Sequence, residues 1–272
     1  MADVLLNSSP LAPGASAVRI HYRDVGEGPP IAILHGGWGY DVYPFDRQIA
    51  ALAPGHRIVI PDRTGYGGSG TLDSLPTDFH QRAATETRAV MDALVLERPI
   101  LWGHSDGAII ALLIGLAAPE RISGAIVEAT HYFKHKPASR TFFEGVAAKP
   151  RSKFLETHSR TWLRIVDEAL PGEDFYGGRL SELAIPLLVI HGARDPRTEP
   201  GELEALQKAV GVGADPRVGP GRTHGSAPTS VLVLAQGGHS PHSEPATSAL
   251  VTEAAVGFLA GVAQGVGPAK QR

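Results

Sequence analysis

Short apolar runs that alternate with helical patterns constrain this chain of 272 residues more than any other feature. The runs lie at 17–22, 30–34, 57–61, 99–102, 122–127, 185–190 and 230–235. Several are continuous and rich in β-branched residues, which is typical of strands buried on both faces of a parallel sheet. Apolar residues at helical spacing lie between them, at 79–95, 106–117 and 246–260. This alternation predicts an α/β fold with a doubly wound, mostly parallel sheet.

One stretch breaks the alternation. Residues 131–183 hold two helix-like pieces, 138–147 and 152–169, and no convincing strand. We therefore expect a core made of 1–130 and 184–272, and a small helical cap at 131–183. The Gly- and Pro-rich stretch 211–229 is interpreted as a long loop, and 264–272 as a frayed tail.

Composition excludes several classes of protein. The chain has no cysteine, so disulfides, thiolate metal sites and a cysteine nucleophile are excluded. A net charge of -3 gives no reason to expect nucleic acid as a partner. The longest apolar run, 107–118, is too short to span a bilayer, and the first residues lack the pattern of a secretion signal. We expect a cytoplasmic protein with a small-molecule substrate, either monomeric or a small homo-oligomer, with no membrane partner.

Polar residues and glycines follow almost every predicted strand. They form HGGWG at 35–39, DRTGYGGS at 62–69, GHSDG at 103–107, Glu128, HGARD at 191–195 and GGH at 237–239. In doubly wound sheets, ligands bind beyond the carboxyl ends of the strands. We therefore expect these segments to form the functional site.

Ser105 is the candidate nucleophile. It lies in Gly-x-Ser-x-Gly, directly between a predicted strand and a predicted helix. A sharp turn at this place projects the serine Oγ outward, and the helix N-terminus offers N–H groups to a developing oxyanion. A serine that merely caps the helix is the alternative.

A serine needs a base, and the base needs an orienting carboxylate. His239 follows the last predicted strand and is the candidate base, with His242 and His224 as competitors. Asp195 follows the preceding strand and is the candidate acid, with Glu128 as the rival. The resulting order Ser105, Asp195, His239 is that of one hydrolase class.

The backbone N–H groups of Asp106 and Gly37 are the candidate oxyanion-hole donors, because each lies in a turn after a strand. His35, His104 and His191 also follow strands, but no HExxH or similar ligand spacing is present. We therefore expect neither a catalytic metal nor a cofactor.

Aromatic and basic residues near the expected site each allow two interpretations. Such aromatic residues more often belong to the core, but pockets are also built from them. The candidates for a pocket wall are Trp38, Tyr40 and Tyr43, and those for the lining of the cap are Phe133, Phe142, Phe143, Phe154 and Trp162. Arg151, Lys153, His158 and Arg160 form a basic patch in the cap. We interpret this patch as a solvated face rather than as a site for a carboxylate-bearing substrate.

The motifs quoted above, in their order and spacing over about 17–260, resemble the α/β-hydrolase fold family. The resemblance implies that Ser105, Asp195 and His239 form the triad and that 131–183 covers the pocket. Two features depart from the common pattern: the charged Asp106 directly after the nucleophile, and the long 211–229 loop. Some relatives carry the acid after the sixth strand, which keeps Glu128 open.

These observations predict a cofactor-independent serine hydrolase. We expect it to cleave a small to medium carboxylic ester through an acyl-enzyme on Ser105. The same triad would also serve a lactonase or a C–C bond hydrolase, and the fold would also suit a non-catalytic ligand-binding protein.

Overall fold

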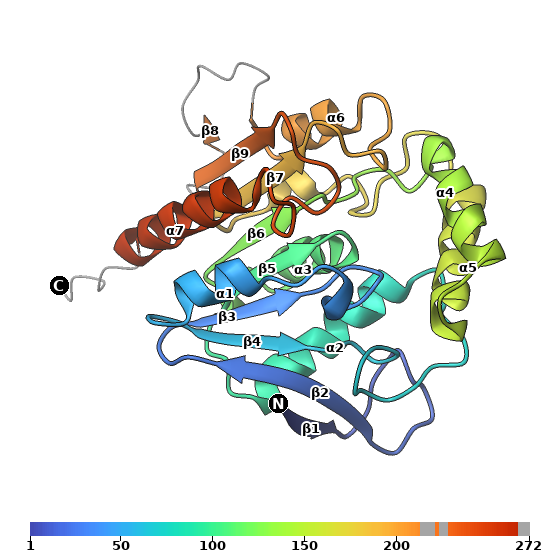
Figure 1. The fold of residues 1–272 in the computed structure, drawn as a ribbon, viewed down its shortest axis with the longest axis horizontal. Helices are drawn as coiled ribbons and strands as arrows, with labels where there is room; N and C mark the ends of the chain where they lie inside the picture. The colour runs from blue at the N-terminus through green and yellow to red at the C-terminus, as the bar shows by residue number, and fades with distance from the viewer. Residues whose placement is uncertain (213–220, 223–227, 266–272) are drawn as a thin grey trace.

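The computed structural model describes residues 1–212, 221–222 and 228–265. Its strands form one sheet in the order β1-β2-β4-β3-β5-β6-β7-β9-β8 (Figure 1). They are β1 (Ala2–Leu6), β2 (Val18–Val25), β3 (Pro30–Leu34), β4 (Arg57–Pro61), β5 (Ile100–His104), β6 (Gly124–Glu128), β7 (Leu187–Gly192), β8 (Gly221–Arg222) and β9 (Pro228–Leu234). The central strands from β4 to β9 pair in parallel, while β1, β2 and β8 are antiparallel to their neighbours. The predicted doubly wound, mostly parallel sheet is confirmed.

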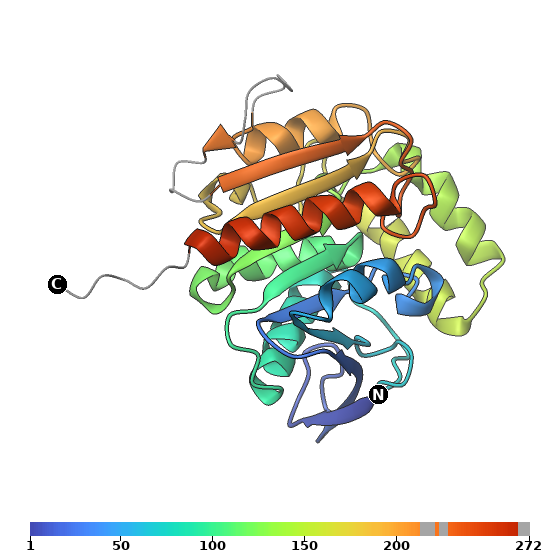
Figure 2. The ribbon, with the colours of Figure 1, turned by 60° about the vertical axis from the view of Figure 1, so that its left-hand side comes forward.

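Helices cover both faces of this sheet (Figures 1 and 2). They are α1 (Asp46–Leu52), α2 (Phe79–Ala93), α3 (Asp106–Ala117), α4 (Pro137–Ala148), α5 (Lys153–Glu168), α6 (Glu202–Ala209) and α7 (Ser248–Gly265). Alternate residues of a strand point to opposite faces. Ala32 and Leu34 of β3 accordingly pack into the core with α2 and α3, while Ile31 and Ile33 pack with α1 and α7. The continuous apolar strands are therefore buried on both sides.

Among the described strands and α-helices, four were not expected from the sequence: β1, α1, β8 and α6. The strand β8 lies inside the stretch interpreted as one loop, 211–229, and β9 begins at Pro228, so this interpretation was wrong for those residues. Helix α7 reaches Gly265 and includes the first two residues of the expected tail, whose remainder lies outside the described residues. By length and mean hydropathy (1.2), α7 alone among the described helices could cross a membrane, a test that core helices also meet.

Helices α4 and α5 occupy the stretch where the two helix-like pieces were expected. They stand beyond the carboxyl ends of the central strands (Figure 1). Ser152 starts α5, because its hydroxyl accepts the N–H of Leu155 (3.1 Å). Both helices thus lie at the end of the sheet that carries the polar loops. The division into a core and a separate cap stays a prediction.

Candidate active site

Ser105 occupies a strained turn between β5 and α3. Its backbone has φ 54 and ψ -117, a conformation that costs energy for a residue with a side chain. Its N–H donates to the carbonyl of Glu128 (2.9 Å), which ties the turn to β6. A Cβ on Gly107 would lie 1.9 Å from the carbonyl oxygen of Leu34, and one on Gly103 would lie 2.2 Å from that of Gly107. The two glycines of Gly-x-Ser-x-Gly therefore permit the close packing that holds this turn.

Three side chains from distant loops meet at this turn. The Oγ of Ser105 lies 3.1 Å from Nε2 of His239, and Nδ1 of His239 lies 2.8 Å from Oδ2 of Asp195. Asp195 follows β7 and His239 follows β9, and these two strands are neighbours in the sheet. All three residues are buried. The structure thus brings together the three residues that the sequence analysis singled out.

The electrostatics of the trio favour a neutral imidazole. Burial lowers the pKa of His239 below its ordinary value, and the nearby Arg197 guanidinium lowers it further, while Asp195 works in the opposite direction. Burial alone would raise the pKa of Asp195, but His239 and the N–H of Arg197 hold it well below the ordinary value. Asp195 is therefore ionised and accepts the Nδ1 proton, which leaves Nε2 of His239 free to accept the serine proton.

The turn after β3 packs directly against the serine. A Cβ on Gly36 would lie 2.9 Å from Nδ1 of His104 and 3.2 Å from Cβ of Ser105. Arg63 braces this turn, because its Nη1 donates to the carbonyl of His35 (2.7 Å) and its Nη2 to that of Gly36 (3.3 Å). Gly37 lies next in this turn, and Asp106 is the first residue of α3, where a backbone N–H has no partner within the helix.

The Asp106 side chain is the centre of a buried hydrogen-bond network. Its Oδ1 accepts from Nε2 of His80 (3.1 Å) and from Nε1 of Trp162 (3.2 Å), and its Oδ2 accepts from Nε2 of His158 (2.8 Å). Burial would raise the pKa of Asp106, but these histidines hold it well below the ordinary value. His158 is buried here, so its assignment to a solvated basic face was wrong.

The rival acid, Glu128, lies close to the trio but bonds a different histidine. Its Oε1 accepts from both the backbone N–H (2.9 Å) and Nδ1 (2.6 Å) of His242. The other ring nitrogen of His242 donates to the carbonyl of Tyr43 (3.0 Å), and its ring stacks on Phe45. The competitor His242 is thus held away from Ser105 by its own partners. The other competitor, His224, lies outside the described residues.

His104, Glu128 and His242 place metal-binding atom types within 4.8 Å of one another. Nε2 of His104 donates to the carbonyl of His239 (2.9 Å), His242 uses both ring nitrogens, and Glu128 uses Oε1, while Oε2 of Glu128 has no partner among the described residues. The cluster therefore serves to tie the His239 loop to β5 and β6.

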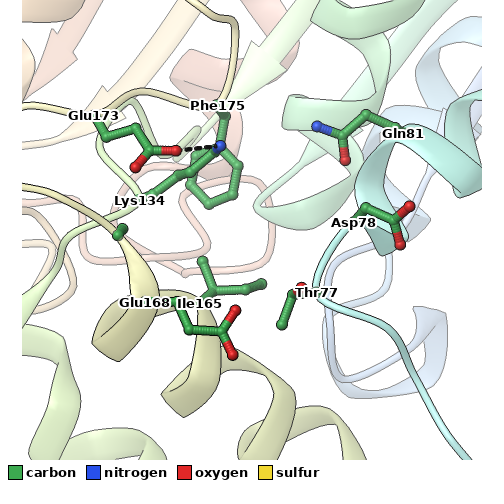
Figure 3. A pocket seen from close by; sticks show the side chains of 9 residues that line it. Thr77, Asp78, Gln81, Lys134, Ile165, Glu168, Glu173 and Phe175 are labelled. Carbon is green, nitrogen blue, oxygen red and sulfur yellow. Dashed lines mark hydrogen bonds and ion pairs between the residues drawn. The ribbon is translucent and has the colours of Figure 1, made fainter.

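A cavity of about 280 Å³ lies where the start of α2 meets the end of α5 (Figure 3). Its lining residues are Thr77, Asp78, Gln81, Lys134, Ile165, Glu168, Ala169, Glu173 and Phe175. Lys134 and Glu173 form an ion pair at its rim (2.7 Å), and Phe175 contacts His80 with ring centroids 4.9 Å apart. Ser105 and His239 are not among the lining residues, so the cavity is separate from the serine and contacts the Asp106 network through Phe175 and His80.

Several residues near the serine were missed by the sequence analysis. His80 belongs to a regular helix, and no local motif marks it. Trp162 was a candidate for the lining of the cap, but its bond to Asp106 was not expected. The sequence did contain one signal, the charged Asp106 after the serine, because a carboxylate buried there requires donors. Arg197, two residues after Asp195, was likewise not singled out.

Known proteins match this architecture. Residues 31–249 match the sequence profile described as the alpha/beta hydrolase family. A thermophilic esterase from Thermogutta terrifontis, solved with malate bound, has a similar fold, with a TM-score of 0.66 and 19% identity over 96% of this chain and 99% of that chain.

Sequence relatives are hydrolases too. "Serine hydrolase BPHL" from Mus musculus is 28% identical over 200 residues, which are 66% of this chain and 68% of the mouse protein. "2-Hydroxy-6-oxo-6-phenylhexa-2,4-dienoate hydrolase" from Burkholderia cepacia is 37% identical over 122 residues, which are 42% of this chain and 41% of that protein. The match thus spans less than half the length of the second relative. With its fold and family profile in agreement, this chain is a hydrolase that belongs to the alpha/beta hydrolase family.

Proposed function

We propose that this hydrolase cleaves small to medium carboxylic esters through an acyl-enzyme formed on Ser105. The observation that carries the proposal is the continuous path of hydrogen bonds from Asp195 through His239 to Ser105, with a lowered pKa at His239. A chain that only bound a ligand would need none of these contacts.

The first half of the reaction breaks the ester. Oγ of Ser105 attacks the acyl carbon as its proton passes to Nε2 of His239, and Asp195 stabilises the imidazolium that results. The N–H groups of Gly37 and Asp106 stabilise the negative charge on the carbonyl oxygen. His239 then gives its proton to the departing alcohol oxygen, which leaves the acyl group on Ser105.

The second half releases the acid. His239 takes a proton from water as the water oxygen attacks the acyl carbon, and the same donors stabilise the second oxyanion. When the intermediate collapses, the proton on His239 returns to Oγ of Ser105. The free acid leaves, and the enzyme returns to its starting state with no net change of protonation.

A labelling experiment tests the proposal. The wild-type protein should react with a fluorophosphonate probe and hydrolyse p-nitrophenyl butyrate, and Ser105→Ala should do neither. Ser123→Ala is the matched control. Ser123 directly precedes β6, at the end of that strand opposite the site, and its hydroxyl donates to the carbonyl of Arg98. Wild-type protein that neither labels nor turns over esters would instead favour a non-catalytic ligand-binding protein.

A C–C bond hydrolase is the second candidate, supported by the similarity to the dienoate hydrolase of Burkholderia cepacia. The same trio would also suit a lactonase. A series of p-nitrophenyl esters, lactones and a dienoic diketo acid, compared by kcat/KM, separates the three activities. We expect the highest value for an ester.

A further inference from the structure

Arg197 lies beside the trio, and within the part of the chain that the structure describes its guanidinium forms no ion pair with a carboxylate. Only 8% of Arg197 is exposed. Its main-chain N–H donates to Oδ1 of Asp195 (2.9 Å), and its carbonyl accepts from the hydroxyl of Ser139 (3.1 Å). None of the ion pairs among residues 1–212, 221–222 and 228–265 includes its side chain, and the uncharged polar side chain that acts on its guanidinium is the hydroxyl of Tyr43.

Other buried cations of the chain have partners. Lys136 pairs with Glu202, and Arg63 donates to two backbone carbonyls. Withdrawing an unpaired charge from water is costly, and burial accordingly lowers the pKa of Arg197, although the Tyr43 hydroxyl and Asp195 counteract this. A buried cation that lacks an anionic partner and lies beside a nucleophile indicates a place for a ligand of opposite charge.

The surroundings of Arg197 connect it to both halves of the site. Its Cζ lies 4.1 Å above the ring of Phe142 in α4, and the ring of Trp38, which follows Gly37, packs against Phe142 with centroids 5.9 Å apart. Its charge also acts on His239, whose pKa it lowers. Arg197 therefore adds one cation to aromatic walls next to the reacting groups.

We propose that Arg197 binds a carboxylate carried by the substrate at a distance from the cleaved bond, so that the enzyme prefers half-esters of short dicarboxylic acids. This inference rests on the proposed ester hydrolysis. The planar fork of a guanidinium matches the two oxygens of a carboxylate. One cation with Asp195 close by suits a monoanion better than a phosphate dianion, which would call for more donors.

Two substrates that differ only in the remote group test this. They are p-nitrophenyl butyrate and the mono-p-nitrophenyl ester of glutaric acid. Wild type should favour the half-ester in kcat/KM, and Arg197→Gln should lose this preference by roughly 10- to 100-fold, mainly through KM. Arg197→Lys should keep part of it, because the charge remains but the fork is lost. Arg194→Gln, an exposed arginine of the same loop, is the matched control and should keep the wild-type ratio.

If Arg197 acted only through its charge on His239, Arg197→Gln would change kcat/KM by the same factor for both substrates. That result overturns the proposal. Binding to the inactive Ser105→Ala protein separates this inference from the proposed function. Calorimetry should detect binding of glutarate to the Ser105→Ala protein. The double variant with Ser105→Ala and Arg197→Gln should show no binding. If no ester is turned over but glutarate binds in this way, only the proposed function fails. If glutarate does not bind, or inorganic phosphate binds more tightly, the carboxylate site is disproved.

Discussion

At the scale of single residues, the two candidate acids of the triad, Asp195 and Glu128, each bond a different histidine. Asp195 holds Nδ1 of His239, while Glu128 holds Nδ1 of His242 and the N–H of Ser105 through its carbonyl. Sequence position alone left both acids open, because Glu128 ends β6 and Asp195 follows β7, and these strands are neighbours in the sheet. Their hydrogen bonds give them different expected roles: Asp195 orients the base, and Glu128 positions the loop that carries it.

Replacing each acid by its amide should separate these roles. We expect Asp195→Asn to lower kcat by roughly 10⁴-fold, because the wrong tautomer of His239 would be favoured. Glu128→Gln keeps an acceptor for the N–H of His242, so its loss should be far smaller. Steady-state kinetics with p-nitrophenyl butyrate, with circular dichroism to check folding, measures both. A larger loss in Glu128→Gln would reverse the assignment.

The pH profile should report His239. Its pKa is lowered below the ordinary 6.5 by burial and by Arg197. Protonated His239 cannot accept the serine proton, so kcat/KM should fall as the pH drops, with a midpoint below 6.5. Arg197→Gln removes a nearby positive charge and should move this midpoint to higher pH. Measuring kcat/KM between pH 4.5 and 8 tests both expectations. A wild-type midpoint above 6.5 would contradict the assignment of His239 as the base.

At the scale of elements, helix α5 is fastened to the nucleophile turn. His158 and Trp162 lie one turn apart on α5 and both donate to the carboxylate of Asp106, the first residue of α3. A Cβ on Gly37 would lie 2.3 Å from Cε1 of His158. The glycine after β3 therefore makes room for a side chain of α5 beside an expected oxyanion donor.

Removing one of these donors should loosen α5. His158→Ala takes a donor from a buried carboxylate, which costs roughly 1–3 kcal/mol. Hydrogen exchange of 153–168 should become faster than in wild type. Arg160→Ala, on the exposed side of the same helix and paired only with Glu156, is the control and should exchange like wild type. Equal exchange in both variants would mean that the Asp106 network does not hold the helix.

The sequence analysis predicted each element that is apolar on every side and therefore buried on every side. Strands such as β3 and β5 are apolar on both faces, and α3 is apolar all round. The missed elements are short or exposed on one side. Leu5 of β1 is 68% exposed, β8 has two residues, and α1 has seven, so none carries a long periodic pattern. Pairing with neighbours, rather than local pattern, places them.

At the scale of the whole molecule, many histidines are buried in a neutral state. The pKa values of His35, His80, His104, His131, His191 and His239 are all lowered, with burial as the largest cause. In the unfolded chain the same groups bind protons near pH 6.5. At a pH between the lowered pKa values and about 6.5, the unfolded state therefore binds more protons than the folded state.

Stability should consequently fall as the pH drops below about 6.5. Within this window, each such histidine lowers the free energy of unfolding by up to about 1.4 kcal/mol for every unit that the pH drops. Above the window this stability is fully present. Urea unfolding at pH 7.5 and pH 5.5 measures the difference, and the midpoint should be clearly lower at pH 5.5. An unchanged midpoint would mean that these rings are already accessible to protons in the folded state.

The sequence by itself determined the alternation of strands and helices, the turn at Ser105 and a short list of candidates for its partners, namely three histidines and two acids. It could do so because strand burial, glycine turns and the order of strand ends are local properties of the chain. Only the tertiary structure decided between Asp195 and Glu128 and buried His158. It also left Arg197 with no carboxylate partner among the described residues. These depend on which side chains from distant segments share a small volume, since partners and solvent exposure, not residue type, set the charge and hydrogen bonding of a buried group.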